Sequence, residues 1–178
     1  MKTFNQILKA FSFIALFVAT CATNLQAQSP FTHSTTSSNN SGHITTINHS
    51  TTNNNPNALV FISQQYGQYN DHQVGVWYSG GKWKIYNEDF AKMPTSTHFN
   101  VVALSPSDRV FMHKATSSNI TKNWTIIDHP KANNQPNAII VVTQNWKGTY
   151  NAKPIGVWYT GGKWAIYNQD RSPMPANA

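Results

Sequence analysis

The protein has 178 residues and a formal net charge of +7 at pH 7, with six acidic residues and a single cysteine. Its cations are scattered along the chain, which argues against nucleic acid as a partner, because a nucleic-acid-binding surface needs clustered Lys and Arg. The few acids, and the lack of a G-x-S-x-G, H-E-x-x-H or phosphate-loop motif, argue against an enzyme and against a bound cofactor.

The first 27 residues are organised like a secretory signal peptide. Lys2 and Lys9 precede the apolar run Ala10–Ala22, and the small Ala27 offers a cleavage position. The run is too short and too early for a transmembrane helix. Cleavage would leave 11 cations, 6 acids and no thiol, so we predict a secreted or periplasmic bacterial protein without a transmembrane segment. Cys21 ends the tetrapeptide VATC, which keeps lipoprotein anchoring open as an alternative.

The rest of the chain contains one unit twice. The segment FTHSTTSSNN at Phe31 returns as FMHKATSSNI at Phe111, and GVWYSGGKWKIYNED at Gly75 returns as GVWYTGGKWAIYNQD at Gly156. Such self-similarity at a fixed spacing is typical of tandem structural repeats. The parts expected are a first unit at residues 28–104, a linker at 105–110 and a second unit at 111–178.

Runs rich in Val, Ile, Thr and aromatic residues alternate with clusters of Asn, Gly, Pro and Ser, and no segment shows helical periodicity. We predict an all-β protein whose two units form a sandwich or a barrel-like antiparallel architecture. The strands expected in the first unit are Phe31–Thr35, His43–Asn48, Ala58–Gln64, Val74–Ser79, Lys82–Asn87 and Phe99–Leu104. Their counterparts begin at Phe111, Trp124, Ala138, Ile155 and Lys163, and the second unit lacks the last strand.

The repeated hairpin has a two-residue turn, Gly80-Gly81 in the first unit and Gly161-Gly162 in the second. Glycine supplies the positive φ that type I′ and II′ turns need, and such a turn fixes the strand register. Alternation along the strands then gives one apolar face, which we expect to be core. The residues on that face are Val74, Val76, Tyr78, Trp83 and Ile85.

The opposite face of each hairpin also carries aromatic side chains. Trp77, Lys84 and Tyr86 share it in the first unit, and Trp158 and Tyr167 share it in the second. If this face is buried, it forms a contact between units or sheets. If it is exposed, it offers a platform on which sugars stack, and two platforms would give bivalent avidity. These five residues are the candidate ligand-binding residues.

Three further patterns have simpler explanations than ligand binding. His33 and His49 recur as His113 and His129, but no carboxylate recurs beside them, so we predict hydrogen-bonded histidines and no metal. The turns Asn87–Asp89 and Asn168–Asp170 carry oxygen ligands suited to calcium, yet self-capping Asp and Asn turns explain them better. The clusters NNNPNA and NNQPNA are predicted turns whose amides could also meet sugar hydroxyls.

The second unit follows the pattern TIIDHP, PNAIIVVTQNW, PIGVWY, GKWAIYNQD and MP, which resembles an uncharacterised family of repeats in secreted bacterial proteins. The resemblance spans Phe111–Ala178 and, more loosely, Phe31–Val102. It implies a small all-β extracellular module, often in tandem, with no established ligand. Members of that family usually close with a Phe-Asn-Val strand, which Phe99–Val101 supplies in the first unit.

The leading functional hypothesis is a secreted, non-catalytic module that binds extracellular polysaccharide or cell-envelope glycan. The alternative is a structural or adhesive matrix protein whose repeats self-associate, and a membrane-active β toxin is a third possibility. Because the second unit lacks the strand equivalent to Phe99–Leu104, we also expect an open sheet edge there, available for homo-association unless Gln28–Thr35 folds back to fill it.

Overall fold

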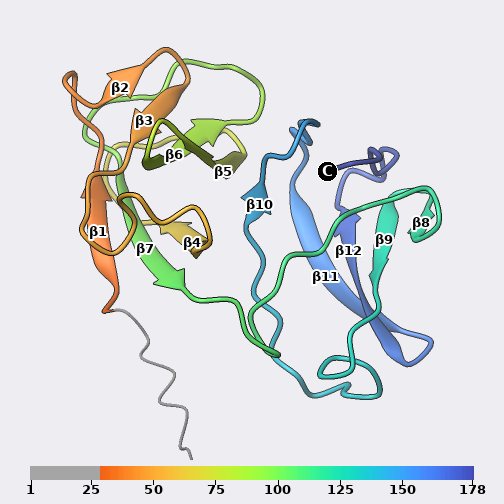
Figure 1. Ribbon diagram of the computed structural model, residues 1–178. Coiled ribbons are helices and arrows are strands. Elements are labelled where there is room, and N and C mark those ends of the chain that lie inside the picture. The colour runs from red at the N-terminus through yellow and green to blue at the C-terminus, as the bar shows by residue number, and fades with distance from the viewer. Residues whose placement is uncertain (1–28) are drawn as a thin grey trace, which may run out of the picture.

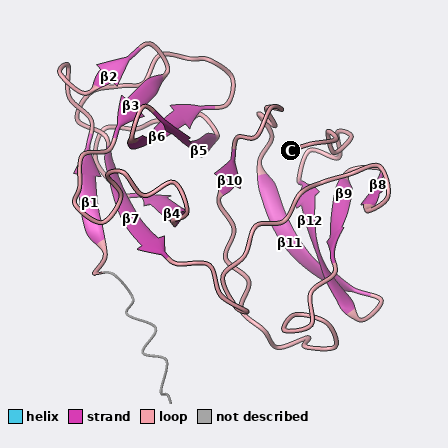
Figure 2. Cartoon of the chain, viewed as in Figure 1, coloured by secondary structure: helices cyan, strands magenta, loops and turns pink. Residues whose placement is uncertain are grey.

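The computed structural model describes residues 29–178, which contain strands and loops and no helix (Figures 1 and 2). Within these residues there is accordingly no helix that is long and apolar enough to cross a membrane. The predicted signal peptide, with Cys21, lies outside the described residues. The predicted all-β class is therefore confirmed for the part of the chain that the structure describes.

The strands form three sheets, and none of them closes into a barrel. The first sheet has the order β1-β7-β4 and the second β10-β5-β6-β3-β2, while the third has the order β11-β12-β9-β8. Strand bounds in the first unit are β1 Phe31–Ser34, β2 Asn40–Ser41, β3 Ile44–Thr46, β4 Leu59–Gln64, β5 Val74–Ser79, β6 Lys82–Asn87 and β7 His98–Leu104. Those in the second are β8 Ile120–Thr121, β9 Trp124–Ile127, β10 Gln144–Asn145, β11 Ile155–Thr160 and β12 Lys163–Asn168.

The first unit is a small sandwich with a closed core. Inward-facing side chains of β4 and β7 meet those of β5 and β6, and loop residues such as Met93 fill the ends. Burial of these apolar side chains is the main force that holds the two sheets together. The fully buried members include Val76, Trp83, Ile85, Phe99 and Val101.

The predicted hairpin register and core face are confirmed. Tyr78 lies opposite Trp83, and Gly75 lies opposite Tyr86. Gly80 and Gly81 both have positive φ, at 59° and 76°, as a type I′ turn requires. The second hairpin repeats this register between β11 and β12.

Two strands predicted in the second unit are not formed. The segment that begins at Phe111 has no strand, and that which begins at Ala138 has only β10 at its end. In the first unit the equivalent strands, β1 and β4, do not pair with each other, because β7 lies between them and pairs with both. In the second unit no such middle strand lies between the two flanking segments, residues 111–114 and 138–143. Their backbones therefore have no strand with which to pair. The expected open edge is therefore a gap between two segments.

The N-terminal segment does not fill this gap, because β1 is paired with β7 inside its own unit. Instead β10, from the second unit, lies between the two halves of the molecule and adds to the outer edge of β5 (Figure 1). This pairing is parallel, whereas the other strand pairs are antiparallel. The two units thus share a sheet.

Candidate functional site

The outward face of the first hairpin is covered by a loop of the second unit. Trp146 meets Trp77 edge to face, with ring centroids 5.6 Å apart, and Tyr150 meets Tyr86 in the same way at 5.6 Å. The backbone N–H of Trp146 donates to the carbonyl of Val76 at 3.0 Å, continuing the β10–β5 pairing. Edge-to-face aromatic pairs of this kind stabilise a contact beyond the area they bury.

A buried hydrogen-bonded chain completes this contact between units. The Tyr86 hydroxyl donates to Glu88 Oε1 at 2.8 Å, and the Asn151 backbone N–H donates to Glu88 Oε2 at 3.0 Å. Burial raises the pKa of Glu88, and the two hydrogen bonds lower it in part. Burial, and then the neighbouring Glu88, raises the pKa of Tyr86. The carboxyl group therefore links the two units.

The equivalent face of the second unit is uncovered among the described residues. Trp158 is 42% exposed and packs edge to face on Trp124, with ring centroids 4.9 Å apart. Tyr167 is half-buried beside Gly156. β11 is the outermost strand of its sheet, so its outer backbone edge is free of a strand partner.

The five candidate ligand-binding residues therefore have different environments. Tyr86 is only 2% exposed, and Trp77 is half-buried beneath Trp146. Lys84 Nζ lies 4.7 Å from the Trp77 ring, where a cation–π contact holds it. Of the two predicted platforms, only that of Trp158 and Tyr167 faces solvent.

A loop of the first unit matches the loop that covers Trp77. Tyr66 occupies the repeat position of Trp146, and Tyr69 that of Tyr150. The Tyr66 and Tyr69 rings are 6.1 Å apart and meet at 87°, whereas the Trp146 and Tyr150 rings are 5.9 Å apart and meet at 47°. Yet Tyr66 is 90% exposed and Tyr69 is 68% exposed. An aromatic pair at the repeat position of the covering loop thus lies in solvent.

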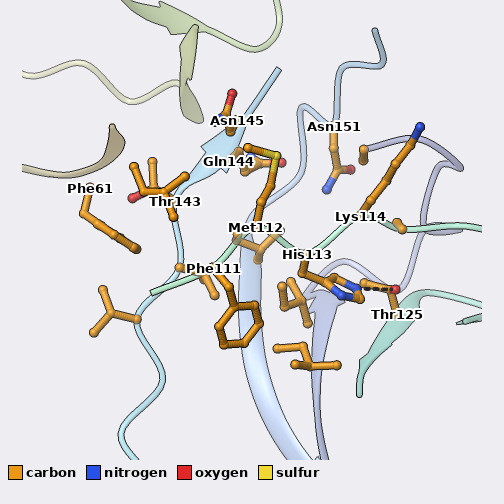
Figure 3. A pocket seen from close by; sticks show the side chains of 18 of the residues that line it. Phe61, Phe111, Met112, His113, Lys114, Thr125, Thr143, Gln144, Asn145 and Asn151 are labelled. Carbon is orange, nitrogen blue, oxygen red and sulfur yellow. Dashed lines mark hydrogen bonds between the residues drawn. The ribbon is translucent and has the colours of Figure 1, made fainter. Parts of the chain in front are cut away.

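The third feature is an apolar groove between the two units, at the gap left between the flanking segments of the second unit (Figure 3). Leu59, Val60 and Phe61 of β4 line the side that faces the first unit. It encloses about 240 Å³. Ile155 and Ile166 of the hairpin line it, together with Phe111 and Val142 of the two flanking segments. Figure 3 shows Phe111 and His113 pointing to one side of their segment and Met112 to the other, as residues of a strand do.

The exposed loop, the uncovered hairpin face and the groove together account for most of the large apolar side chains that the described residues expose. Tyr66, Tyr69 and Trp158 belong to the loop and the uncovered face. Met112, Ile139 and Val141 belong to the flanking segments of the groove, and Phe90 packs on Tyr150 at the contact between the units. Clustered exposure of this kind marks interaction sites more often than scattered exposure does.

The recurring histidines are held by neighbours in their own unit. His33 Nε2 lies 2.8 Å from Thr45 Oγ1, and the ring of His49 stacks on Phe31 at 3.8 Å. The second unit repeats both contacts. Burial lowers the pKa of His33, which favours its neutral form. Residues 29–178 contain no cluster of three or more His, Cys, Asp or Glu side chains that could hold a metal.

The acidic turns cap their own backbone. Asp89 Oδ1 accepts from the Ala91 N–H at 3.0 Å, and Asp170 Oδ1 accepts from the Ser172 N–H at 2.9 Å. Hydrogen bonds from Ser172 lower the pKa of Asp170 to about 2, and Lys153 contributes further. These are the Asp-capped turns expected from the sequence.

Sequence reasoning did not single out Tyr66, Trp146 or Tyr150 as contact residues. Alternation within one hairpin identifies a face but not the segment that covers it. The available signal was the repeat itself, since both units place an aromatic pair in the same loop before the hairpin.

Together these features define a tandem all-β repeat protein whose units join through an aromatic loop and a hairpin face. The chain belongs to a family described as a domain of unknown function, DUF7452, whose model matches it twice, at residues 2–103 and 87–178. With the offset of 81 between units, the second match ends at the position equivalent to Thr97, just before β7. No curated protein and no solved structure was found to be similar to the chain.

Proposed function

We propose that this protein is a structural, self-associating repeat protein whose copies join head to tail. One observation carries the proposal: the loop of the second unit packs on the hairpin face of the first, while the equivalent loop and the equivalent face are both free. The loop of one copy, with Tyr66 and Tyr69, would then cover Trp158 and Tyr167 of the next. Such a contact joins two different surfaces, so it extends into a chain of copies.

The contact between the two units of one chain shows which further interactions we expect between two copies. The outer edge of β11 at Gly156 would accept the backbone near Gln64, as β5 accepts β10. Gln169, which replaces Glu88, would accept the Asn70 N–H as Glu88 accepts that of Asn151. Arg171 replaces Phe90, whose ring lies 4.6 Å from Tyr150, and a guanidinium stacks well on a tyrosine ring. Because the leader predicts export, we place this assembly outside the cytoplasm.

The test uses two variants that each lose one surface. Trp158→Ala removes the face, and the double variant Tyr66→Ser/Tyr69→Ser removes the loop. Each should weaken self-association of residues 28–178 at least about tenfold, because truncation of an aromatic anchor typically costs 2 kcal/mol or more. Sedimentation velocity at rising concentration measures this. Ile139→Ser, at a 91% exposed side chain outside both surfaces, is the control and should associate like the wild type.

Mixing the two variants distinguishes a head-to-tail contact from a symmetric one. Each variant alone should stay monomeric, and an equimolar mixture should stop at a heterodimer, because each partner contributes one intact surface. A symmetric contact would not be rescued by mixing. A wild type that stays monomeric at all concentrations would contradict the proposal.

The second candidate function is glycan binding at the same face, supported by the 42% exposure of Trp158. A glycan-array screen of residues 28–178 should then give ligands whose affinity falls about tenfold in Trp158→Ala, by analogy with the 1–3 kcal/mol of base–aromatic stacking. Trp77→Ala should change glycan affinity little, because Trp146 already covers that ring. If the array gives no ligand, this candidate is rejected.

A further inference from the structure

We propose that the contact between the two units contains an aromatic cage that binds a methylated ammonium group, such as the trimethylammonium end of choline. The cage is a small hollow to which both units contribute side chains. Its lining residues are Trp77 and Tyr86 of the first hairpin, Trp146 and Tyr150 of the covering loop, and His43 and Ile44. The proposal is independent of head-to-tail association, because all walls of the cage belong to one chain.

Four aromatic rings surround the hollow at steep angles to one another. Trp77 and Trp146 meet at 73°, and Tyr86 and Tyr150 meet at 88°. Trp146 and Tyr150 meet at 47°. Rings inclined in this way form the walls of a box, whereas parallel rings close into a stack. Because the face of an aromatic ring carries the negative part of its quadrupole, such a box attracts a cation.

Two of these rings already interact with charged groups. Lys84 Nζ lies 4.7 Å from the Trp77 ring and donates to the Ser79 carbonyl at 3.0 Å, and it does not line the hollow. A cation of the chain itself therefore uses this ring. The Tyr86 hydroxyl donates to Glu88 Oε1 at 2.8 Å. A phenol that donates to a carboxyl group has more electron density in its ring, which strengthens its attraction for a cation.

The lining favours a methylated ammonium over a metal ion or a primary ammonium. Among the described residues that line the hollow, none is acidic, and His43 supplies the one imidazole. A metal ion or a primary ammonium would lose its bound water there and gain few ligands in return. A methylated nitrogen gives up fewer hydrogen bonds to water, so its charge enters the cage at a lower cost.

The size and the access of the hollow suit a compact group. It encloses about 40 Å³, which is roughly three times the volume that one water molecule requires. Apart from Tyr86, its lining residues are only half-buried, so the hollow opens to solvent. The methylated end of a ligand would enter, and the rest of the ligand would stay outside.

The second unit shows which side chain would fill the hollow. Ile44 lies opposite Tyr86, and Trp124 lies opposite Tyr167, so Ile44 and Trp124 occupy the same repeat position. Trp124 packs on Trp158 with ring centroids 4.9 Å apart. Ile44 is smaller and leaves this space open in the first unit. The size of one side chain therefore decides whether the cage has room for a ligand.

The test titrates residues 28–178 with choline at constant ionic strength and follows binding by calorimetry. The chain should bind choline at least about tenfold more tightly than its neutral isostere, in which a tert-butyl group replaces the trimethylammonium. Ile44→Trp copies the side chain of the second unit into the first and should abolish binding without unfolding the chain. Trp158→Ala, outside the cage, should bind choline with the wild-type affinity.

A second measurement leaves every side chain in place. Fluorinated tryptophan, incorporated throughout the chain, weakens the negative face of each indole ring and should lower the affinity for choline at least about threefold. The circular dichroism spectrum should stay unchanged. Equal binding of choline and its neutral isostere would overturn the proposal, because the hollow would then be merely apolar. So would an Ile44→Trp chain that binds choline like the wild type, or a folded wild type without saturable binding.

Discussion

Trp83→Ala should destabilise the protein by roughly 3–5 kcal/mol, the usual cost of removing a large aromatic side chain from a closed core. Trp83 is 1% exposed, packs against Tyr78 and donates its indole N–H to the Asn55 carbonyl at 2.9 Å. Both the packing and the hydrogen bond would be lost. Urea denaturation followed by circular dichroism measures the change.

The matched variant is Trp164→Ala in the second unit. Trp164 makes the same two contacts, to Tyr159 and to the Gln135 carbonyl, but it is only half-buried. Its removal should cost about half as much, because less apolar surface is lost from the core. Equal costs for the two variants would mean that the core of the second unit is closed, which would contradict the open groove.

Gly75→Ala should destabilise the first unit by roughly 1–3 kcal/mol through overpacking. A Cβ at Gly75 would lie 2.6 Å from Tyr86 Cζ and from Glu88 Oε1. Neither group can move away, because Tyr86 donates to Glu88 and packs on Tyr150, while Glu88 accepts from Asn151. Thermal unfolding monitored by circular dichroism tests this variant.

Gly156→Ala is its counterpart in the second unit. The new Cβ would lie 2.8 Å from Tyr167, whose half-buried ring has no covering loop and can shift. The expected cost is below about 1 kcal/mol, since the clash is with the far end of one side chain. If Gly156→Ala is as costly as Gly75→Ala, Tyr167 is held as firmly as Tyr86, and the uncovered face is not free.

The hairpins were predictable from sequence because their determinants are local. A Gly-Gly turn requires positive φ at both positions, and that geometry fixes which residues pair across the strands. Once the register is set, strict alternation assigns Trp83 to one face and Trp77 to the other. The predicted strands Val74–Ser79 and Lys82–Asn87 accordingly coincide with β5 and β6.

The second unit shows where sequence patterns were insufficient. Residues 111–114 and 138–143 have nearly the same pattern of apolar residues as β1 and β4, and yet they form no strand. A strand needs a partner as well as a pattern, because its backbone groups must be satisfied by another strand. The order β1-β7-β4 makes β7 that partner, and this order depends on contacts far apart in the chain.

The sequence by itself determined the all-β class, the duplication, the hairpin register and the two aromatic faces, because turn geometry and alternation act over a few residues. Only the tertiary structure decided that Trp77 is covered by Trp146 while Trp158 is not, and that β7 is a middle strand. Those outcomes depend on which distant segments meet. The same hairpin is therefore an internal joint in one unit and an open surface in the other.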